Sequence, residues 1–240
     1  MAYYIYAIIE TDERLDFGPI GLGERPVYTL GPDGLKCVVS DAHLTEYIAN
    51  TLNLGEHERV LEKVMQGHTI LPMSFGSVAS DEKEIILMLK KHRATFLRLL
   101  NKLTGKVEVA VEILWKDIKA VFSEIAESNP KLKKLKSNSG PKSRDDVIMA
   151  GQMVFQLLHE MKRRETETLV KVLRRASIDY LINPNTEDEF VMKGSFLVDK
   201  TRMADFDRAL DLFDKNNEKR MRIKCIGPTP PYSFANVRVK

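Results

Sequence analysis

The chain has 240 residues, of which 43% are hydrophobic and 30% are charged, and its formal net charge at pH 7 is +3. This length suits one large domain or two smaller ones, with enough apolar residues to form a core without disulfide or metal crosslinks. The small net charge gives no strong electrostatic reason to expect a nucleic-acid or membrane partner. No apolar run approaches the roughly 18 residues of a membrane-spanning helix, so we expect a cytosolic protein.

The amino-terminal sequence and the two cysteines are also typical of a cytosolic protein. Residues Tyr3–Ile9 are aromatic and β-branched, so they predict a first strand, and they lack the basic flank of a signal peptide. Cys37 and Cys225 lie in separate strand-like segments. We favour two buried, reduced thiols, and one disulfide between them is the alternative.

The rest of the first half alternates strand and helix signals. Glycine and proline mark turns, β-branched runs mark strands, and apolar residues at helical spacing mark helices. The predicted elements are a loop at Asp16–Pro26, a hairpin of Val27–Leu30 with Leu35–Ser40, a helix at His57–Met65, an irregular strand at Thr69–Phe75, a helix at Ser80–Leu103 with Ser80 as its N-cap, and a strand at Lys106–Trp115.

A lysine-rich segment marks the main change in composition. Asn129–Ser143 combines lysines with a cluster of serine, asparagine, glycine and proline, which predicts a linker or an exposed loop. We interpret the lysines within Lys131–Lys136 as a solvated surface. The alternative is that they contact phosphates, as in a nucleic-acid-associated protein.

A helix of roughly thirty residues is predicted at Arg144–Ala176, because this segment has no proline and one glycine. Its middle, KRRETET, contains no apolar residue and predicts that the helix projects past the body of the protein into water. The elements around it are a helix at Asp117–Ala126, strands at Ile178–Ile182 and Phe190–Val198, a helix capped by Thr201, and a last strand at Met221–Ile226.

This element order favours the α+β class, with helices packed on one face of a sheet. We expect two domains. Residues 1–116 form an N-terminal ferredoxin-like α+β domain, and residues 117–240 form a modified ferredoxin-like domain that contains the long helix and the carboxyl-terminal tail.

The residues show no enzyme signature. His57-Glu58 and His159-Glu160 each begin an HExxH pattern, but Leu61 and Arg163 occupy the position of the second histidine. The motifs of a phosphate loop and a nucleophile elbow are absent as well. We therefore expect no catalytic residue, no metal and no cofactor, with isolated histidines at the surface or half-buried.

The tail GPTPPYSF, Gly227–Phe234, is the least ordinary segment. Proline donates no backbone hydrogen bond, so this segment cannot continue a central strand. We favour a strap in which Pro230, Pro231, Tyr232 and Phe234 pack on the N-terminal domain and join the two halves. A free docking peptide for a partner is the alternative.

Five segments together resemble one known family, the gas vesicle protein F/L family. They occur in the family's order and span nearly the whole chain, and the second and last are the most specific. They are YYIYAII at the amino terminus, ILPMSFGSV at Ile70–Val78, LTGKVEVAVEILW at Leu103–Trp115, GSFLVDK at Gly194–Lys200, and GPTPPYSF.

The resemblance implies a non-enzymatic accessory protein of gas vesicle assembly, found in the cytoplasm or with the vesicle. Its implied partners are the major gas vesicle shell protein and other gas vesicle accessory proteins. We expect a monomer that binds neither nucleic acid nor membrane. An exposed sheet edge of this protein could pair with a strand of the apolar shell subunit, which would otherwise be prone to aggregate.

Overall fold

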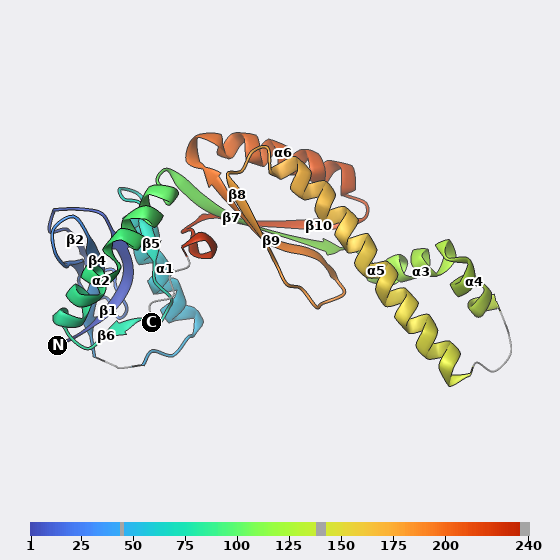
Figure 1. The fold of residues 1–240 in the computed structure, drawn as a ribbon, viewed down its shortest axis with the longest axis horizontal. Helices are drawn as coiled ribbons and strands as arrows, with labels where there is room; N and C mark the ends of the chain where they lie inside the picture. Colours follow the sequence, from blue (N-terminus) through green and yellow to red (C-terminus); the bar gives the residue numbers. More distant parts are fainter. Residues whose placement is uncertain (44–45, 138–142, 236–240) are drawn as a thin grey trace. The chain divides into compact units, whose positions relative to one another are not determined.

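The computed structural model describes residues 1–43, 46–137 and 143–235. The chain forms two compact units, Met1–Glu108 with Pro228–Lys240, and Val109–Gly227 (Figure 1). Each unit contains a sheet and helices, so the predicted α+β class is confirmed. The domain boundary at residues 116/117 stays a prediction. The division between the two compact units falls within strand β7 (Lys106–Trp115), and the carboxyl-terminal tail belongs to the first unit.

The first unit is built on an antiparallel sheet of six strands in the order β2-β3-β4-β1-β5, with β6 also paired to β1. The predicted hairpin is present, and a short strand, β2, lies in the predicted loop and pairs with β3. The strands are β1 (Ala2–Ile9), β2 (Asp16–Gly18), β3 (Val27–Leu30), β4 (Lys36–Ala42), β5 (Ile70–Pro72) and β6 (Val78–Ala79).

Two helices, α1 (Thr51–Met65) and α2 (Glu82–Leu103), complete the first unit. Helix α1 begins six residues before the predicted start, because the Asn50 side chain caps it by accepting a hydrogen bond from the backbone N–H of Asn53. The predicted cap of α2 is wrong. Asp81 accepts from the N–H of Glu84, and Ser80 instead donates to the Glu84 carboxylate.

The core of the first unit contains hydrogen-bonded polar groups. The Tyr4 hydroxyl lies 2.9 Å from Nδ1 of His57, and the Tyr6 hydroxyl lies 2.9 Å from the Ser40 hydroxyl. His57 is 2% exposed, so the expectation that every histidine is isolated at or near the surface is wrong for this one. Burial lowers the pKa of His57 to about 4, because the charged imidazolium is poorly solvated in this core.

The second unit has a four-stranded sheet in the order β10-β7-β9-β8, in which β8 and β9 pair antiparallel. Its elements follow the strand–helix–strand–strand–helix–strand sequence of a split βαβ fold, whereas four strands precede the first helix of the first unit. The ferredoxin-like description stays a prediction. The remaining strands are β8 (Asp179–Asn183), β9 (Phe190–Asp199) and β10 (Met221–Thr229).

The helices of the second unit are α3 (Ile118–Ser128), α4 (Pro130–Ser137), α5 (Arg144–Leu173) and α6 (Met203–Asn217), with a short 3-10 helix at Lys200–Arg202. Helix α4 lies in the predicted linker, because Asn129 caps it and Leu132 is buried against α3 and α5. The rest of that linker, residues 138–142, lies outside the described residues. The predicted cap Thr201 is wrong, since Asp199 caps the 3-10 turn that leads into α6.

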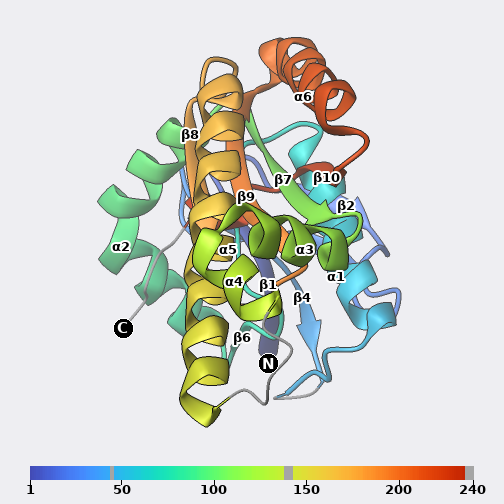
Figure 2. The ribbon, with the colours of Figure 1, turned by 90° about the vertical axis from the view of Figure 1, so that its right-hand side faces the viewer.

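Helices α5 and α6 pack against β9 and against each other (Figures 1 and 2). The buried rings of Phe196 on β9 and Phe206 on α6 are 5.5 Å apart at the heart of this core. Leu169 and Leu173 of α5 are fully buried in the same core. These apolar residues hold the second half of α5 on the sheet.

The predicted projection of KRRETET into water is therefore wrong. Lys162 is 7% exposed and donates a 2.7 Å hydrogen bond to the carbonyl of Glu187. Glu165 forms an ion pair with Arg220, whose guanidinium also lies 5.0 Å from the centre of the Trp115 ring. The polar residues of this segment thus anchor α5 to the unit.

The burial of His57 predicts a pH dependence of stability. Its pKa is about 4 in the folded protein and about 6.5 when unfolded, so the unfolded state binds more protons between these values and stability falls as pH decreases. Between pH 7 and pH 4.5 this one group should lower the free energy of unfolding by roughly 2–3 kcal/mol. Urea titrations at the two pH values measure the change.

The matched comparison is between His57→Gln and His43→Gln, because His43 is exposed. The first substitution should flatten the pH dependence by that amount, and the second should leave it as in the wild type. Equal pH dependence in the wild type and in His57→Gln would show that His57 is not the group responsible.

Candidate functional site

The carboxyl-terminal tail packs on the first unit. Pro230, Pro231 and Phe234 are buried, and Tyr232 is half-buried at the start of a 3-10 turn. The Tyr232 hydroxyl donates a 2.8 Å hydrogen bond to the carboxylate of Glu58 on α1. Burial and the neighbouring Glu58 carboxylate both raise the pKa of Tyr232, so its hydroxyl keeps the proton that it donates.

A second set of hydrogen bonds holds the tail through Glu108. The Glu108 side chain is 6% exposed, and its carboxylate accepts from the backbone N–H of Ser233 at 2.8 Å and from the Ser233 hydroxyl at 2.6 Å. The Thr229 hydroxyl donates to the Glu108 carbonyl at 3.2 Å. A buried carboxylate without these donors would be costly, so Glu108 and Ser233 depend on each other.

The second unit carries a groove between α5 and α6, with a volume of about 580 Å³. We call it the α5–α6 groove. One side is formed by Thr168, Lys171 and Val172 of α5 and by Arg175 and Ala176 of the turn that follows it. The opposite side is formed by Arg202, Asp205, Ala209 and Leu212.

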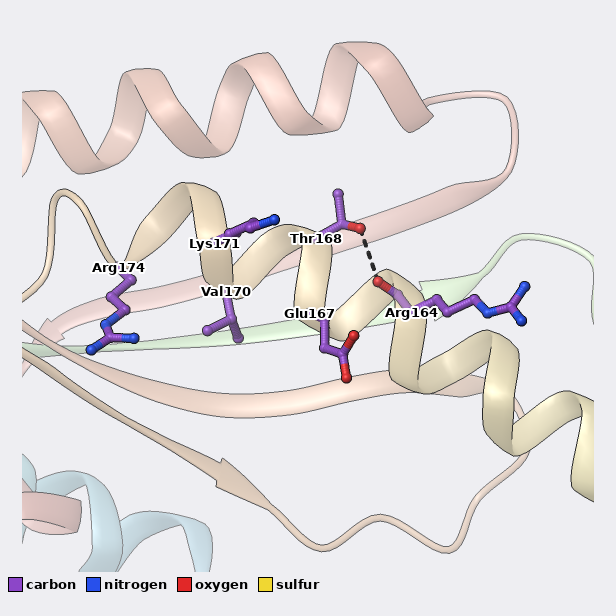
Figure 3. A pocket seen from close by; sticks show the side chains of 6 residues that line it. All are labelled: Arg164, Glu167, Thr168, Val170, Lys171 and Arg174. Carbon is purple, nitrogen blue, oxygen red and sulfur yellow. Dashed lines mark hydrogen bonds between the residues drawn. The ribbon is translucent and has the colours of Figure 1, made fainter.

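A neighbouring hollow on α5 extends this groove and shares Thr168 and Lys171 with it. Figure 3 shows these two side chains on the side of α5 that faces α6, and Glu167, Val170 and Arg174 on the other side. The Thr168 hydroxyl donates a 2.9 Å hydrogen bond to the carbonyl of Arg164, which fixes its orientation (Figure 3).

Positive charge dominates both hollows. Among the described residues, the exposed side chains of Lys171, Arg174 and Arg175 have no ion-pair partner. The two carboxylates of the lining are already engaged, Glu167 by Arg163 at 2.7 Å and Asp205 by arginines of its own helical turn. The surface therefore has cationic groups available for an anionic partner.

Exposed apolar side chains mark two further surfaces of the second unit. On the first half of α5, Val147 is 57% exposed and Phe155 is 59% exposed. Strand β8 is an edge of its sheet, and the Leu181 and Ile182 side chains on it are each 41% exposed. An open, apolar strand edge offers unpaired backbone groups and an apolar surface to another strand.

The structure corrects the interpretation of the cysteines. Both thiols are free, and Cys37 is buried as predicted, which raises its pKa. Cys225 is exposed, because β10 is the other edge of the second sheet and most of its side chains face solvent.

The lysines that the sequence offered as a phosphate contact lie on α4. Lys131, Lys133 and Lys134 are exposed on α4, and the side chain of Lys136 lies outside the described residues. Across residues 1–43, 46–137 and 143–235, no three histidine, cysteine or acidic side chains are grouped so as to hold a metal. No helix in this part of the chain is long and apolar enough to cross a membrane.

Sequence reasoning missed the α5–α6 groove. The two basic residues Lys171 and Arg175, close together in the sequence, were a local signal for one side of it. The other side comes from α6, about thirty residues further along the chain, and only the packing of the two helices brings these sides together.

Comparisons with known proteins agree with the fold and with the motifs. The chain is 29% identical over 239 residues to gas vesicle protein F of Dolichospermum flosaquae, which covers 98% of this chain and 97% of that protein. Two crystal structures of GvpF are similar over 98% of this chain. For the Anabaena sp. PCC7120 protein the TM-score is 0.89 and the sequence identity is 27%, and the match covers 98% of that chain. For the Microcystis aeruginosa protein the TM-score is 0.85 and the sequence identity is 25%, and the match covers 99% of that chain.

A family model described as gas vesicle synthesis protein GvpL/GvpF matches residues 2–236. This match includes both compact units and the segments YYIYAII, ILPMSFGSV and GPTPPYSF. The chain belongs to the gas vesicle synthesis protein GvpL/GvpF family.

Proposed function

We propose that this protein acts without catalysing a reaction in gas vesicle assembly, by binding the major shell protein and other accessory proteins. The observation that carries the proposal is the family match over residues 2–236. The exposed apolar surfaces of the second unit support it, because such surfaces on a folded protein commonly contact partners. The expected cytoplasmic location, with association to the vesicle, is part of the same proposal.

The β8 edge is the surface that we assign to the shell protein. A strand of the partner that pairs with β8 would satisfy the open backbone groups of the edge, and Leu181 and Ile182 would contact its apolar side chains. Gly194 lies opposite Ile182 on β9, and the Ile182 side chain packs over it, in space that a larger residue at position 194 would occupy. The exposed Leu181 and Ile182 on this edge favour an extended apolar segment over a charged one.

For the tail, we retain the strap as the proposed role of Pro230, Pro231, Tyr232 and Phe234. Their burial and the hydrogen bonds to Glu58 and Glu108 support a stabilising role over a free docking peptide. A segment that is packed in this way must first detach before it can bind a partner, and detachment leaves Glu108 without its donors.

Charging the β8 edge should weaken the interaction with the shell protein. We expect Leu181→Lys/Ile182→Lys to weaken the association with purified shell subunit at least tenfold, because burial of an ammonium group in an apolar contact costs more than about 1.4 kcal/mol. The amount of shell subunit that stays in solution after centrifugation, with each variant present, measures the effect.

The matched control for this experiment is Leu87→Lys on α2, since Leu87 is 67% exposed and lies in the first unit. This variant should retain the wild-type effect. If the wild-type protein itself leaves the solubility and association of the shell subunit unchanged, the proposed function is wrong. If the wild-type protein changes the solubility of the shell subunit, and Leu181→Lys/Ile182→Lys does so as well as Leu87→Lys, the assignment of the binding surface to β8 is wrong.

Removal of the tail should lower the melting temperature. Truncation after Thr229 removes the buried Phe234 and both donors of Ser233, and Ser233→Ala alone should cost roughly 1 kcal/mol of stability. The cost of Ser233→Ala should shrink when Glu108→Gln is also present, because the two side chains interact directly.

Thermal and urea unfolding of the four proteins of this double-mutant cycle give the coupling energy, with the exposed Ser74→Ala as a control that should have little effect. Unchanged stability after truncation, together with weaker partner binding, would instead favour the free docking peptide.

A further inference from the structure

We propose that the α5–α6 groove is the docking site for an acidic amphipathic helix of a second protein. This inference rests on the proposed function. A protein that binds the shell protein through the β8 edge needs a second surface to bind another accessory protein. The groove is lined by other residues than those of the β8 edge and has a different chemistry.

The apolar part of the groove fits a helix with one apolar stripe. Its apolar lining consists of Val172 and Ala176 on one side and Ala209 and Leu212 on the other. The two alanines are small enough to leave room for incoming side chains, and Leu212 is 60% exposed. A leucine or isoleucine of the partner would remove this apolar surface from water.

The charged part of the groove selects an acidic partner. Lys171 and Arg175 both line the groove and have no ion-pair partner among the described residues. Since Glu167 and Asp205 are already paired with arginines, they do not neutralise this charge. Carboxylates that flank an apolar stripe would meet these cations at the rim of the groove.

The position of these cations at the end of α5 has a second explanation. Basic side chains near a helix carboxyl terminus are stabilised by the helix dipole, so Lys171 and Arg175 would be favourable there without any ligand. The dipole does not account for an exposed leucine on α6 opposite them. The combination of free cations and an apolar wall is what points to a ligand.

The dimensions and composition favour a helix over a nucleic acid. On one side the groove lining runs from Thr168 to Ala176, which corresponds to roughly two turns of helix, about 11 Å, and suits a short partner helix. No aromatic side chain is among the residues that line either hollow, so a base would have no ring on which to stack. The apolar residues of the lining also contribute nothing to phosphate binding.

The test uses a fluorescent synthetic peptide of about 18 residues, with leucines on one helical face and glutamates on the other. Fluorescence anisotropy with the full chain should show saturable binding that weakens as salt is added. Lys171→Glu/Arg175→Glu should weaken this binding at least tenfold, and Leu212→Ser should weaken it severalfold, because the site uses both charge and apolar contact.

The matched control is Lys131→Glu/Lys133→Glu, which reverses two exposed charges on α4 and should leave peptide binding unchanged. A peptide with lysines in place of the glutamates should not bind. Circular dichroism and melting temperature check that each variant is folded. If the double charge reversal does not fold, Arg175→Ala and Leu212→Ser make the same comparison.

Three results would overturn the proposal. One is binding that is equally strong in the groove variants and in the wild type. Another is a DNA duplex that binds more tightly than the peptide and is released by the same substitutions. The third is a dimer of the chain that the groove variants dissociate, which would make a second copy the occupant. The β8 variant Leu181→Lys/Ile182→Lys should bind the peptide normally, so failure at the shell protein and failure at the groove are distinguishable.

Discussion

The packing of α5 and α6 on β9 is the constraint on which the rest of the second unit depends. Phe196 and Phe206 meet in the core between sheet and helices, and Leu169 and Leu173 bring α5 to the same place. Loss of one such aromatic side chain from a core typically costs about 3–5 kcal/mol, so this contact fixes the positions of both helices. The α5–α6 groove exists because the helices adjoin there.

The same packing determines which apolar side chains of the second unit remain exposed to solvent. The two helices contact β9, while β8 and β10 are the edges of the sheet. The open edge of β8 then carries Leu181 and Ile182, and α5, which also contacts α3 and α4, carries Val147 and Phe155 on its first half. Exposed apolar groups of this kind on a folded protein commonly contact partners, and the proposed role of this chain in gas vesicle assembly would use them in that way.

Local patterns in the sequence predicted most elements but not how they combine. Strand β7 was predicted with its observed bounds, because charged residues alternate with valine and isoleucine along it. The helix caps were less predictable, since Ser80 and Asp81 are both good caps and only the backbone geometry selects Asp81. Helix α4 was missed because its lysines and the following serine and glycine suggest a loop, whereas burial of Leu132 stabilises a helix.

Long-range contacts account for the other misses. The segment KRRETET has no apolar residue, yet Lys162 is buried because a carbonyl 25 positions away accepts its hydrogen bond. Tail residues contact Glu58 and Glu108, which are more than a hundred positions earlier in the chain. The aromatic and proline content indicated a special tail, and the family resemblance came from short motifs, but neither could locate the groove or the open edge of β8.

Hydrogen–deuterium exchange of this protein, with and without purified shell subunit, tests the central claim most directly. If a shell strand pairs with the open edge, amides of Asp179–Asn183 should exchange more slowly when the subunit is present, while amides of the six-stranded sheet exchange at the same rate. Exchange that is the same at every amide in both samples would contradict the claim that this protein works by binding apolar neighbours.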